Sequence, residues 1–193
     1  RAFFGELGYE MLIPTEFTAH VYEALVTAGT PHWLRHVGMF AMNACRLEKG
    51  FRHFGHDIGE EDTPFETGLG FAVDLNKPDF VGKTALMTQK QMAALPDRLV
   101  AISVPELTEK KGPYLAHDET VWKDGQMVGH VTSGGWGHRV QQMIGLATLH
   151  REAGVTKAWI DEGGFSVRIA GRDFPIHAQL APLYDPTGQK MRG

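Results

Sequence analysis

The second half of the chain consists of short apolar runs separated by turn residues, and this pattern constrains the fold more than any other feature. The runs are 99–104, 120–123, 127–131, 144–149, 165–169 and 174–179. Asp124-Gly125 separates two of these runs and favours a tight hairpin, because both turn positions take a positive φ. Gly163-Gly164 and Gly171 indicate two further turns. About six short strands without a helical pattern among them predict a small β-barrel or sandwich.

The first half shows helical spacing instead. A first helix is predicted from apolar residues that recur until Gly29, namely Phe17, Val21, Ala24, Leu25 and Ala28. Further helices are predicted over 34–49 and 80–94, and strands over 9–13 and 69–75. This order is typical of an α+β layer, with helices on one face of a mostly antiparallel sheet. The composition changes at Leu95-Pro96-Asp97, so we expect two domains, residues 1–95 and residues 96–193.

Composition excludes several classes of partner. The 193 residues, of which 42% are hydrophobic, can bury one good core or two small ones. Nineteen basic and twenty-three acidic residues leave no positive excess to hold a phosphate backbone, so we expect no nucleic acid partner. No apolar run approaches the roughly 20 residues that span a bilayer, so no membrane partner is expected. The single cysteine, Cys45, lies in an apolar helical stretch, which is typical of a buried thiol in a reducing compartment.

The chain begins, without an initiator methionine, inside a glycine-spaced segment, RAFFGELGYE. Gly5 and Gly8 allow tight turning of the backbone. The predicted strand 9–13 would then place the Glu10 carboxylate at its start, where it could accept hydrogen bonds from an N–H-rich ring. Spacing alone favours the plainer alternative, in which Glu10 is a surface carboxylate at the edge of a strand.

The GE-x-GYE pattern of this segment is followed by further motifs in a consistent order. They are RLEKG at 46–50, GHD at 55–57, TPFETGLG at 63–70, DFVGKTAL at 79–86 and VTSGGWGHR at 131–139. Together they resemble the glycine cleavage T protein family, the tetrahydrofolate-dependent aminomethyltransferases. The forms EKGFRHFG and SGGWGHR are more similar to the C-terminal halves of sarcosine and dimethylglycine dehydrogenases. In those enzymes a FAD-binding amine oxidase domain precedes the folate domain.

The resemblance implies the C-terminal part of a protein that passes one-carbon units to tetrahydrofolate. Its partners would be a small methylated amine or aminomethyl donor and the missing N-terminal part of the same protein, with FAD only in an upstream domain. The implied setting is the bacterial cytoplasm or the mitochondrial matrix. The family's catalytic aspartate belongs to the absent part, so no catalytic residue is assigned and the fragment alone is expected to be inactive. Alternatives are a free-standing T protein, a related demethylase, or a non-catalytic folate-binding module.

The resemblance also implies which residues bind the cofactor. Glu10 would bind the pterin, with Tyr9 beside it in the same segment. Phe3 stands where the family usually carries a tyrosine, so stacking on the pterin can persist while one hydrogen bond is lost. Trp136 lies in a glycine-rich segment, 133–139, that we expect to be a turned or mobile loop. That loop would either line the entrance to the folate site or hold the two halves of the chain together.

Arg46 matches the family's R-L-E motif and has two possible uses. Its guanidinium could pair with a folate carboxylate or with an acidic group of the protein, since bidentate pairing serves both. The family's folate-contacting arginine lies four residues earlier, where this chain has Met42. Because Met42 and Arg46 would share a helix face, we hypothesise that Arg46 takes over part of the folate binding of that arginine.

A cluster of histidines could be interpreted as a metal site. His53 and His56 stand beside Asp57, but a zinc site usually needs a third or fourth protein ligand with support from neighbouring groups. No cysteine or further histidine is spaced to supply it, so no metal site is predicted. A polar loop that faces a cleft is the simpler interpretation. Together with Lys49 and Arg52, its cations could attract the acidic tail of a folate.

Overall fold

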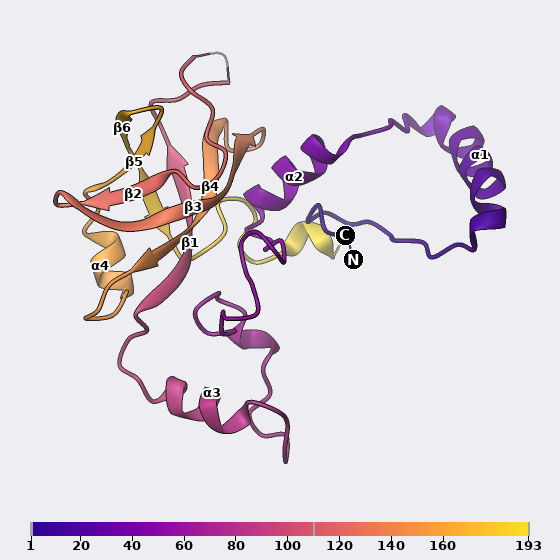
Figure 1. Cartoon of the computed structure of the whole chain (residues 1–193). Coiled ribbons are helices and arrows are strands. Elements are labelled where there is room, and N and C mark those ends of the chain that lie inside the picture. The colour runs from indigo at the N-terminus through magenta and orange to yellow at the C-terminus, as the bar shows by residue number, and fades with distance from the viewer. Residues whose placement is uncertain (1, 110, 193) are drawn as a thin grey trace.

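The structure is a computed structural model in which residues 2–109 and 111–192 are described. Figure 1 shows a barrel from which α2 leads outward to α1, with α3 beneath the barrel. The helices are α1 (Thr18–Gly29), α2 (Met39–Glu48), α3 (Lys83–Lys90) and α4 (Lys157–Asp161). The strands are β1 (Asp97–Val104), β2 (Thr120–Lys123), β3 (Gln126–Gly137), β4 (Gln142–His150), β5 (Phe165–Ile169), β6 (Arg172–Pro175) and β7 (His177–Gln179). Short 3₁₀ turns cover Thr15–Phe17, Thr30–His32, Gly70–Ala72 and Gln189–Met191.

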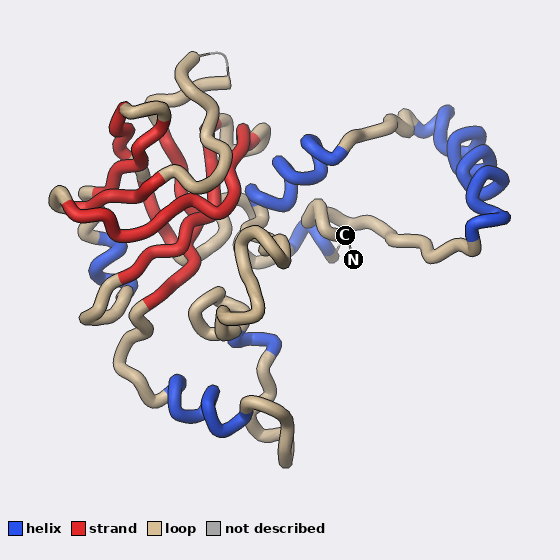
Figure 2. The backbone as a smooth tube through the Cα atoms, viewed as in Figure 1, coloured by secondary structure: helices blue, strands red, loops and turns tan. Residues whose placement is uncertain are grey.

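The strands form one antiparallel sheet in the order β6-β5-β2-β3-β4-β1-β7. β6 and β7 stand at opposite ends of this order but are separated in the chain only by Ile176. The sheet must therefore curl until its two edges approach each other, as Figure 2 shows. At this seam the chain passes from β6 to β7 through Ile176, whose N–H donates to the Phe165 carbonyl at 3.0 Å and so extends the β5–β6 pairing by one residue. The predicted class, α+β with a small C-terminal β-barrel, is confirmed.

The barrel has an inner core and a smaller outer cluster. The inner core includes the fully buried side chains of Ile102, Val104, Val131, Leu149 and Val167. Most of them are β-branched, a shape that packs well on a pleated surface. The outer cluster joins Leu47 of α2 to Leu99, Ala101, Ile144 and Leu146 of β1 and β4. Leu47 thus packs α2 against the outside of the barrel.

In the second half, the predicted strand bounds agree best with the structure beside clear turn residues. β2 and β5 have the predicted bounds, and the hairpin at Asp124-Gly125 has the expected positive φ angles of 51° and 77°. The loop predicted over 133–139 is wrong, because residues 133–137 continue β3 and pair with β4. Glycine weakens a strand by propensity. Here the glycines leave room for close neighbours, which the sequence alone does not reveal.

The expectation that the second half contains no helix is also wrong. α4 spans only five residues, Lys157–Asp161, and is shorter than the window in which helical periodicity can be recognised. Its start does carry a recognisable signal, since the Thr156 side chain accepts a hydrogen bond from the Trp159 N–H at 3.1 Å. Trp159 and Ile160 then bury their side chains against the barrel core.

In the first half the three predicted helices form, but two are shorter than expected. α2 begins at Met39 rather than at residue 34, and α3 covers Lys83–Lys90 within the predicted 80–94. The strands predicted over 9–13 and 69–75 do not form. A strand needs a partner for its backbone groups, and within the described residues neither segment lies beside one. Residues 70–72 form a 3₁₀ turn instead.

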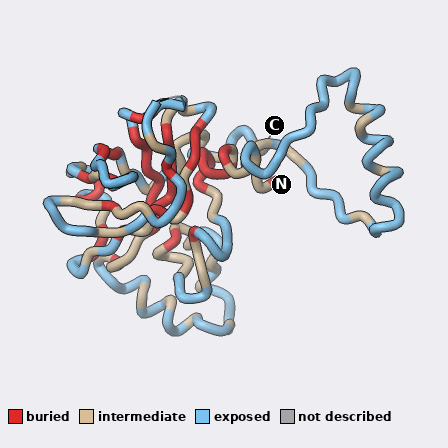
Figure 3. The backbone as a smooth tube through the Cα atoms, turned by 45° about the horizontal axis from the view of Figure 1, so that its top comes forward, coloured by how far each residue is buried: buried red, intermediate tan, exposed pale blue. Residues whose placement is uncertain are grey.

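The N-terminal arm, residues 7–40, is largely exposed. Figure 3 shows it as a mostly pale blue loop that extends away from the barrel on the side where both termini lie. α1 buries none of its residues, although its apolar side chains recur at helical spacing. An amphipathic helix normally buries its apolar face against another element. No such element covers α1 among the described residues.

Candidate functional site

The end of α2 brings charged side chains into the interior. Arg46, Glu48 and Lys49 are all buried, with Leu47 between them packed on the barrel. Buried charges in proteins are normally paired or hydrogen-bonded, because desolvation of an isolated charge is costly. The partners of these three residues come from four segments distant in sequence, and they define the candidate site.

Arg46 is enclosed by hydrogen bonds to the protein. Its side chain is 2% exposed. Nε donates to Asn43 Oδ1 at 2.7 Å, and Nη2 donates to Ser133 Oγ at 2.8 Å. Nη1 donates to the Phe51 carbonyl at 3.0 Å and forms an ion pair with Asp57. Burial lowers the pKa of Arg46, and the neighbouring Asp57 carboxylate opposes that effect.

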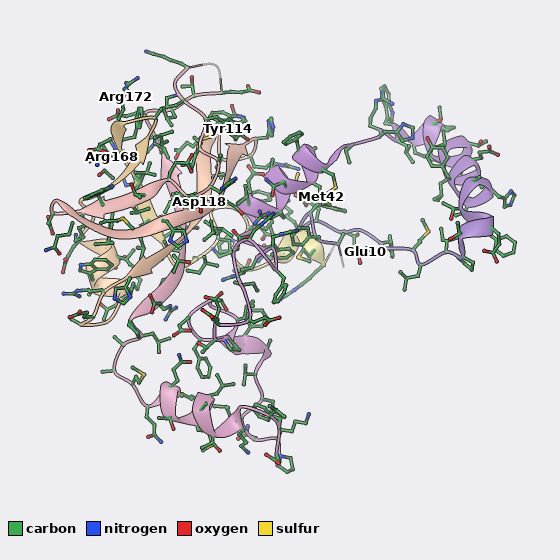
Figure 4. All side chains as sticks on the ribbon, in the orientation of Figure 1. Glu10, Met42, Tyr114, Asp118, Arg168 and Arg172 are labelled. Carbon is green, nitrogen blue, oxygen red and sulfur yellow. The ribbon has the colours of Figure 1, made fainter. Side chains whose placement is uncertain are left out.

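All of these contacts are with protein groups, which favours the structural one of the two uses predicted for Arg46. Met42, labelled in Figure 4, lies on α2 four residues before Arg46. The guanidinium, however, is directed into the interface with β3 and already donates four hydrogen bonds. The geometry gives no support to the hypothesis that Arg46 binds folate in place of an arginine at position 42.

Asp57 is the acceptor that organises this network. Besides the ion pair with Arg46, its carboxylate accepts from the His53 N–H at 2.8 Å and from Thr132 Oγ1 at 2.7 Å. Asp57 is therefore committed to the protein. The rings of His53 and His56 stack with centroids 4.6 Å apart. No group of three potential metal ligands lies together within residues 2–109 and 111–192.

Arg52 holds the neighbouring loop. Its Nε donates to the Thr67 carbonyl at 2.9 Å and its Nη1 to the Gly50 carbonyl at 2.7 Å. Burial lowers its pKa, and the Asp57 carboxylate partly offsets that effect. Arg52 therefore joins the segment after α2 to the TPFETGLG motif, a structural role that the sequence did not reveal.

Glu48 supports the turn that follows β3. Its carboxylate accepts hydrogen bonds from the backbone N–H groups of Arg139 and Val140, the latter at 3.1 Å. Arg139 in turn places its guanidinium 3.6 Å from Glu6 and over the ring of Tyr184. The first residues of the chain, the end of α2 and the turn after β3 thus meet at one place.

Lys49 attaches the C-terminal segment to the same place. Its ammonium forms a buried ion pair with Asp185 and donates to the Asp185 carbonyl at 3.1 Å. The Tyr184 N–H donates to the Glu48 carbonyl at 2.9 Å. The hydrogen bond from Lys49 is the main reason that the pKa of Asp185 lies below its usual value. Lys49 is therefore not free to attract an acidic ligand.

Glycines of β3 allow α2 and a loop to approach the sheet. A Cβ on Gly134 would lie 2.4 Å from the Leu115 carbonyl oxygen, and one on Gly135 would lie 3.3 Å from Leu47 Cδ1. Trp136 follows them but is only 9% exposed and belongs to the barrel core. Its indole is therefore not presented on a loop as expected. The family-like SGGWG motif serves packing in this chain.

The N-terminal segment begins beside the Arg46 network and then leads away from it. Phe3 is half-buried, with its ring centroid 6.5 Å from that of Phe51 and 6.1 Å from that of His53. Tyr9 and Glu10 are exposed on an extended segment that runs from the site toward α1 (Figure 4). The Glu10 side chain forms no hydrogen bond or ion pair with residues 2–109 or 111–192. It lines neither the cavity beside α3 nor the small one beside Gly50.

Sequence reasoning missed most of the buried network. Asp57 stood out only as a possible metal ligand, and Glu48 and Ser133 were not identified. The available signal was three charged residues, Arg46, Glu48 and Lys49, crowded around a leucine at the end of an apolar helix. Charged residues at such positions, ahead of a glycine, indicate a helix end that is buried and paired.

Within the described part of the chain, no helix has both the length and the hydropathy needed to cross a bilayer.

Two family models match the chain. The one described as "GCVT N-terminal domain" matches residues 1–77, and the one described as "Glycine cleavage T-protein C-terminal barrel domain" matches residues 98–185. The second match covers nearly all of the barrel, from β1 to β7. The first covers the arm, α2 and the Arg46–Asp57 pair, whose partners Ser133 and Thr132 lie in the second.

Curated relatives align with the whole chain. A 4-methylaminobutanoate oxidase (formaldehyde-forming) of Paenarthrobacter nicotinovorans is 39% identical over 194 residues, which is 100% of this chain and 22% of the relative. Human mitochondrial sarcosine dehydrogenase is 33% identical over 195 residues, covering 100% of this chain and 21% of the relative. The chain thus spans about a fifth of the length of these relatives.

The fold is shared with a solved structure. The glycine cleavage system aminomethyltransferase T from Bartonella henselae superposes with a TM-score of 0.74 at 21% identity, over 90% of this chain and 45% of that one. At this identity the likeness concerns the fold alone. Since models of one family match both halves and the fold agrees with that family, the chain belongs to the glycine cleavage T-protein family.

Proposed function

We propose that this chain is the C-terminal part of a tetrahydrofolate-dependent protein that takes one-carbon units from a methylated amine. The observation that carries the proposal is full-length similarity to relatives named 4-methylaminobutanoate oxidase and sarcosine dehydrogenase. Both names describe oxidation of N-methylated amines, and one states that formaldehyde is formed. Capture of that carbon by a reduced folate fits the family to which the chain belongs.

The N-terminal segment has the chemistry to hold a reduced pterin. Glu10 has an exposed carboxylate without a partner among the described residues, so both of its oxygens are available to N–H donors. Phe3 and Tyr9 offer aromatic faces on the same segment. Tetrahydrofolate, when bound, supplies the nitrogen that accepts the one-carbon unit. The protein's contribution is to position the ring, which removes much of the entropic barrier between two reactants.

Arg46 and Trp136 have an indirect role in this proposal. Arg46 fastens α2 to β3 through Ser133, and Trp136 anchors β3 in the barrel core. They fix the platform from which the N-terminal segment departs. We therefore propose that both are positioning residues rather than residues that touch the folate.

The arm needs further protein to complete a pocket. Leu12, Phe40 and Trp33 are 100%, 91% and 80% exposed, and apolar surface of this extent usually marks an interaction site. We propose that other parts of a longer protein cover the arm and close the folate pocket. Flavin and the amine site would belong to those parts, in the cytoplasm or the mitochondrial matrix. The 193-residue chain alone would then bind folate weakly or not at all.

Calorimetry of tetrahydrofolate with the longer protein tests the assignment of Glu10. We expect Glu10→Ala to weaken binding by at least about 1 kcal/mol, the scale of one hydrogen bond to a charged group. Glu152→Ala, a change in the exposed turn after β4 and outside the arm, is the matched control and should leave the dissociation constant unchanged. Equal affinities for wild type and Glu10→Ala would contradict the assignment.

The sharing of a fold with an aminomethyltransferase favours a second candidate, a free-standing aminomethyltransferase or demethylase without a flavin domain. A non-catalytic folate-binding module is the third possibility, because a fold does not imply a function. The residues encoded before Arg1 distinguish them. A flavin-binding glycine motif supports the dehydrogenase, and a folate half alone supports the aminomethyltransferase. Folate binding without turnover of methylated amines or aminomethyl donors would leave the third.

A further inference from the structure

A cavity of about 380 Å³ lies between α3 and the barrel, apart from the site described above. Its walls come from the end of α3 and the turn that follows, from the start of β1, and from the residues around the start of α4. Figure 1 shows α3 beneath the barrel, on a different side from the arm that carries Glu10. Neither the buried Arg46 network nor the N-terminal segment contributes to its lining.

Arg98, near the start of β1, is one polar group in this lining. Its Nε is buried and has no hydrogen-bond partner, and its guanidinium forms no ion pair with residues 2–109 or 111–192. Burial lowers the pKa of Arg98, and no carboxylate opposes that effect. A desolvated N–H donor without a hydrogen-bond partner is costly. An anion in the cavity would remove this cost, and the flat donor edge suits the two oxygens of a carboxylate.

Gln89, on α3, is a second polar residue in this lining. Its Nε2 donates to Glu66 Oε1 at 3.0 Å. Glu66 is itself fixed, because its other oxygen accepts from the Thr63 N–H at 2.9 Å and from Thr63 Oγ1 at 2.7 Å. This chain of bonds orients the amide and leaves Gln89 Oε1 buried without a donor. A ligand would satisfy it with an N–H or O–H group.

The remaining lining residues favour a hydroxyl over an ammonium as the ligand group that donates to Gln89. Phe65, Met92 and Leu180 provide apolar surface for a small ligand body, and Lys90 adds a second cation. A ligand ammonium would be repelled by Arg98 and Lys90, whereas a hydroxyl donates to Gln89 without that penalty. The volume lies in the range of small-molecule sites.

We propose that this cavity binds a small hydroxycarboxylate. The carboxylate pairs with Arg98, the hydroxyl donates to Gln89 Oε1, and the carbon skeleton lies against Phe65 and Met92. This site is independent of the proposed folate function, since it shares no residue with the N-terminal segment.

Mandelate is a suitable probe for calorimetry with the 193-residue chain. Phenylacetate lacks its hydroxyl and mandelamide lacks its charge. We expect mandelate to bind, phenylacetate to bind about fivefold or more weakly, and mandelamide about tenfold or more weakly, as expected for the removal of a hydrogen bond and of a charge pair. Absence of mandelate binding up to about 10 mM, the millimolar limit of a specific weak site, would overturn the proposal. Equal binding of mandelate and mandelamide would do the same.

Two variants test the assigned contacts. Arg98→Met should weaken mandelate about tenfold or more, while Arg172→Met on the outer surface of the barrel should leave it unchanged. Gln89→Leu should abolish the preference for mandelate over phenylacetate. The ratio of mandelate affinity to phenylacetate affinity in Gln89→Leu still tests the proposal if Arg98→Met fails to fold. A preference for mandelate that persists in Gln89→Leu would refute the assigned hydroxyl contact.

Discussion

Arg46 and Asp57 form a buried ion pair at the point where α2 meets the barrel. Both side chains are almost inaccessible to solvent, and each also bonds to β3, Arg46 through Ser133 and Asp57 through Thr132. The pair therefore joins the two segments that the family models match separately. We therefore expect the ion pair to be required for the two segments to stay packed against each other.

Removal of one member of this pair should be strongly destabilising. Asp57→Ala leaves the Arg46 charge buried and unpaired, so we expect the free energy of unfolding to fall by about 3–5 kcal/mol. Urea unfolding followed by circular dichroism measures the change. Asp173→Ala, which breaks the exposed pair with Arg168, is the control and should have a much smaller effect. If the free energy of unfolding fell equally in the two variants, the buried pair would contribute no more to stability than the exposed one.

Close packing at β3 gives a second prediction. Gly134→Ala places a Cβ against the Leu115 carbonyl, a backbone group that cannot relieve the clash by changing rotamer. We expect a loss of about 1–3 kcal/mol, the usual cost of overpacking. At Gly59 a Cβ would meet only the Asp62 carboxylate at 3.7 Å, so Gly59→Ala should be nearly neutral. If thermal unfolding shows no difference between the two variants, the tight approach of Leu115 to β3 is incorrect.

The Lys49–Asp185 pair should make stability depend on acid pH. The pKa of Asp185 is depressed in the folded chain, so its ionised form stabilises the fold above the ordinary carboxyl pKa of about 4. That contribution is lost as the pH falls through the lower, folded value. The melting temperature should therefore drop on acidification below about pH 4. Asp185→Asn and Lys49→Met should both flatten this drop. Parallel profiles for wild type and Asp185→Asn would contradict the predicted linkage.

Cys45 should react slowly with alkylating reagents. Burial raises the pKa of its thiol, and the carboxylates of Glu48 and Glu6 raise it further, while Arg139 lowers it. Less thiolate is then present at neutral pH, and thiolate is the reactive form. Glu6→Gln should increase the rate of reaction with iodoacetamide at pH 8, and Arg139→Gln should decrease it. If both substitutions change the rate in the same direction, altered access rather than charge controls the thiol.

The barrel was largely predictable because its signals are local. Asp124-Gly125 determines a hairpin within four residues, and alternation in 165–169 determines which side chains point inward. The glycines at 133–137 misled the prediction, since their role depends on Leu115 and Leu47, which are distant in sequence. Likewise the segments 9–13 and 69–75, predicted as strands, have no pairing partner among residues 2–109 and 111–192, a property that no local pattern contains.

The buried network was harder to predict. Arg46 could be recognised from its motif, but its choice between a ligand and the protein depends on Asp57 and Ser133, eleven and eighty-seven residues away. Charge pairing over such separations leaves no periodic trace in a sequence. Glu10 is the reverse case, because its assignment comes from resemblance and its surroundings within this chain are open.

The seam at Ile176 has a consequence for self-association. The two edge strands of the barrel, β6 and β7, have only four and three residues, and the chain joins them directly. Long exposed edges are what allow one sheet to recruit strands from another molecule. The barrel offers almost no such template, so intermolecular β-pairing should be a minor hazard. Aggregation of the isolated chain would instead begin at the apolar arm, through side chains rather than backbone.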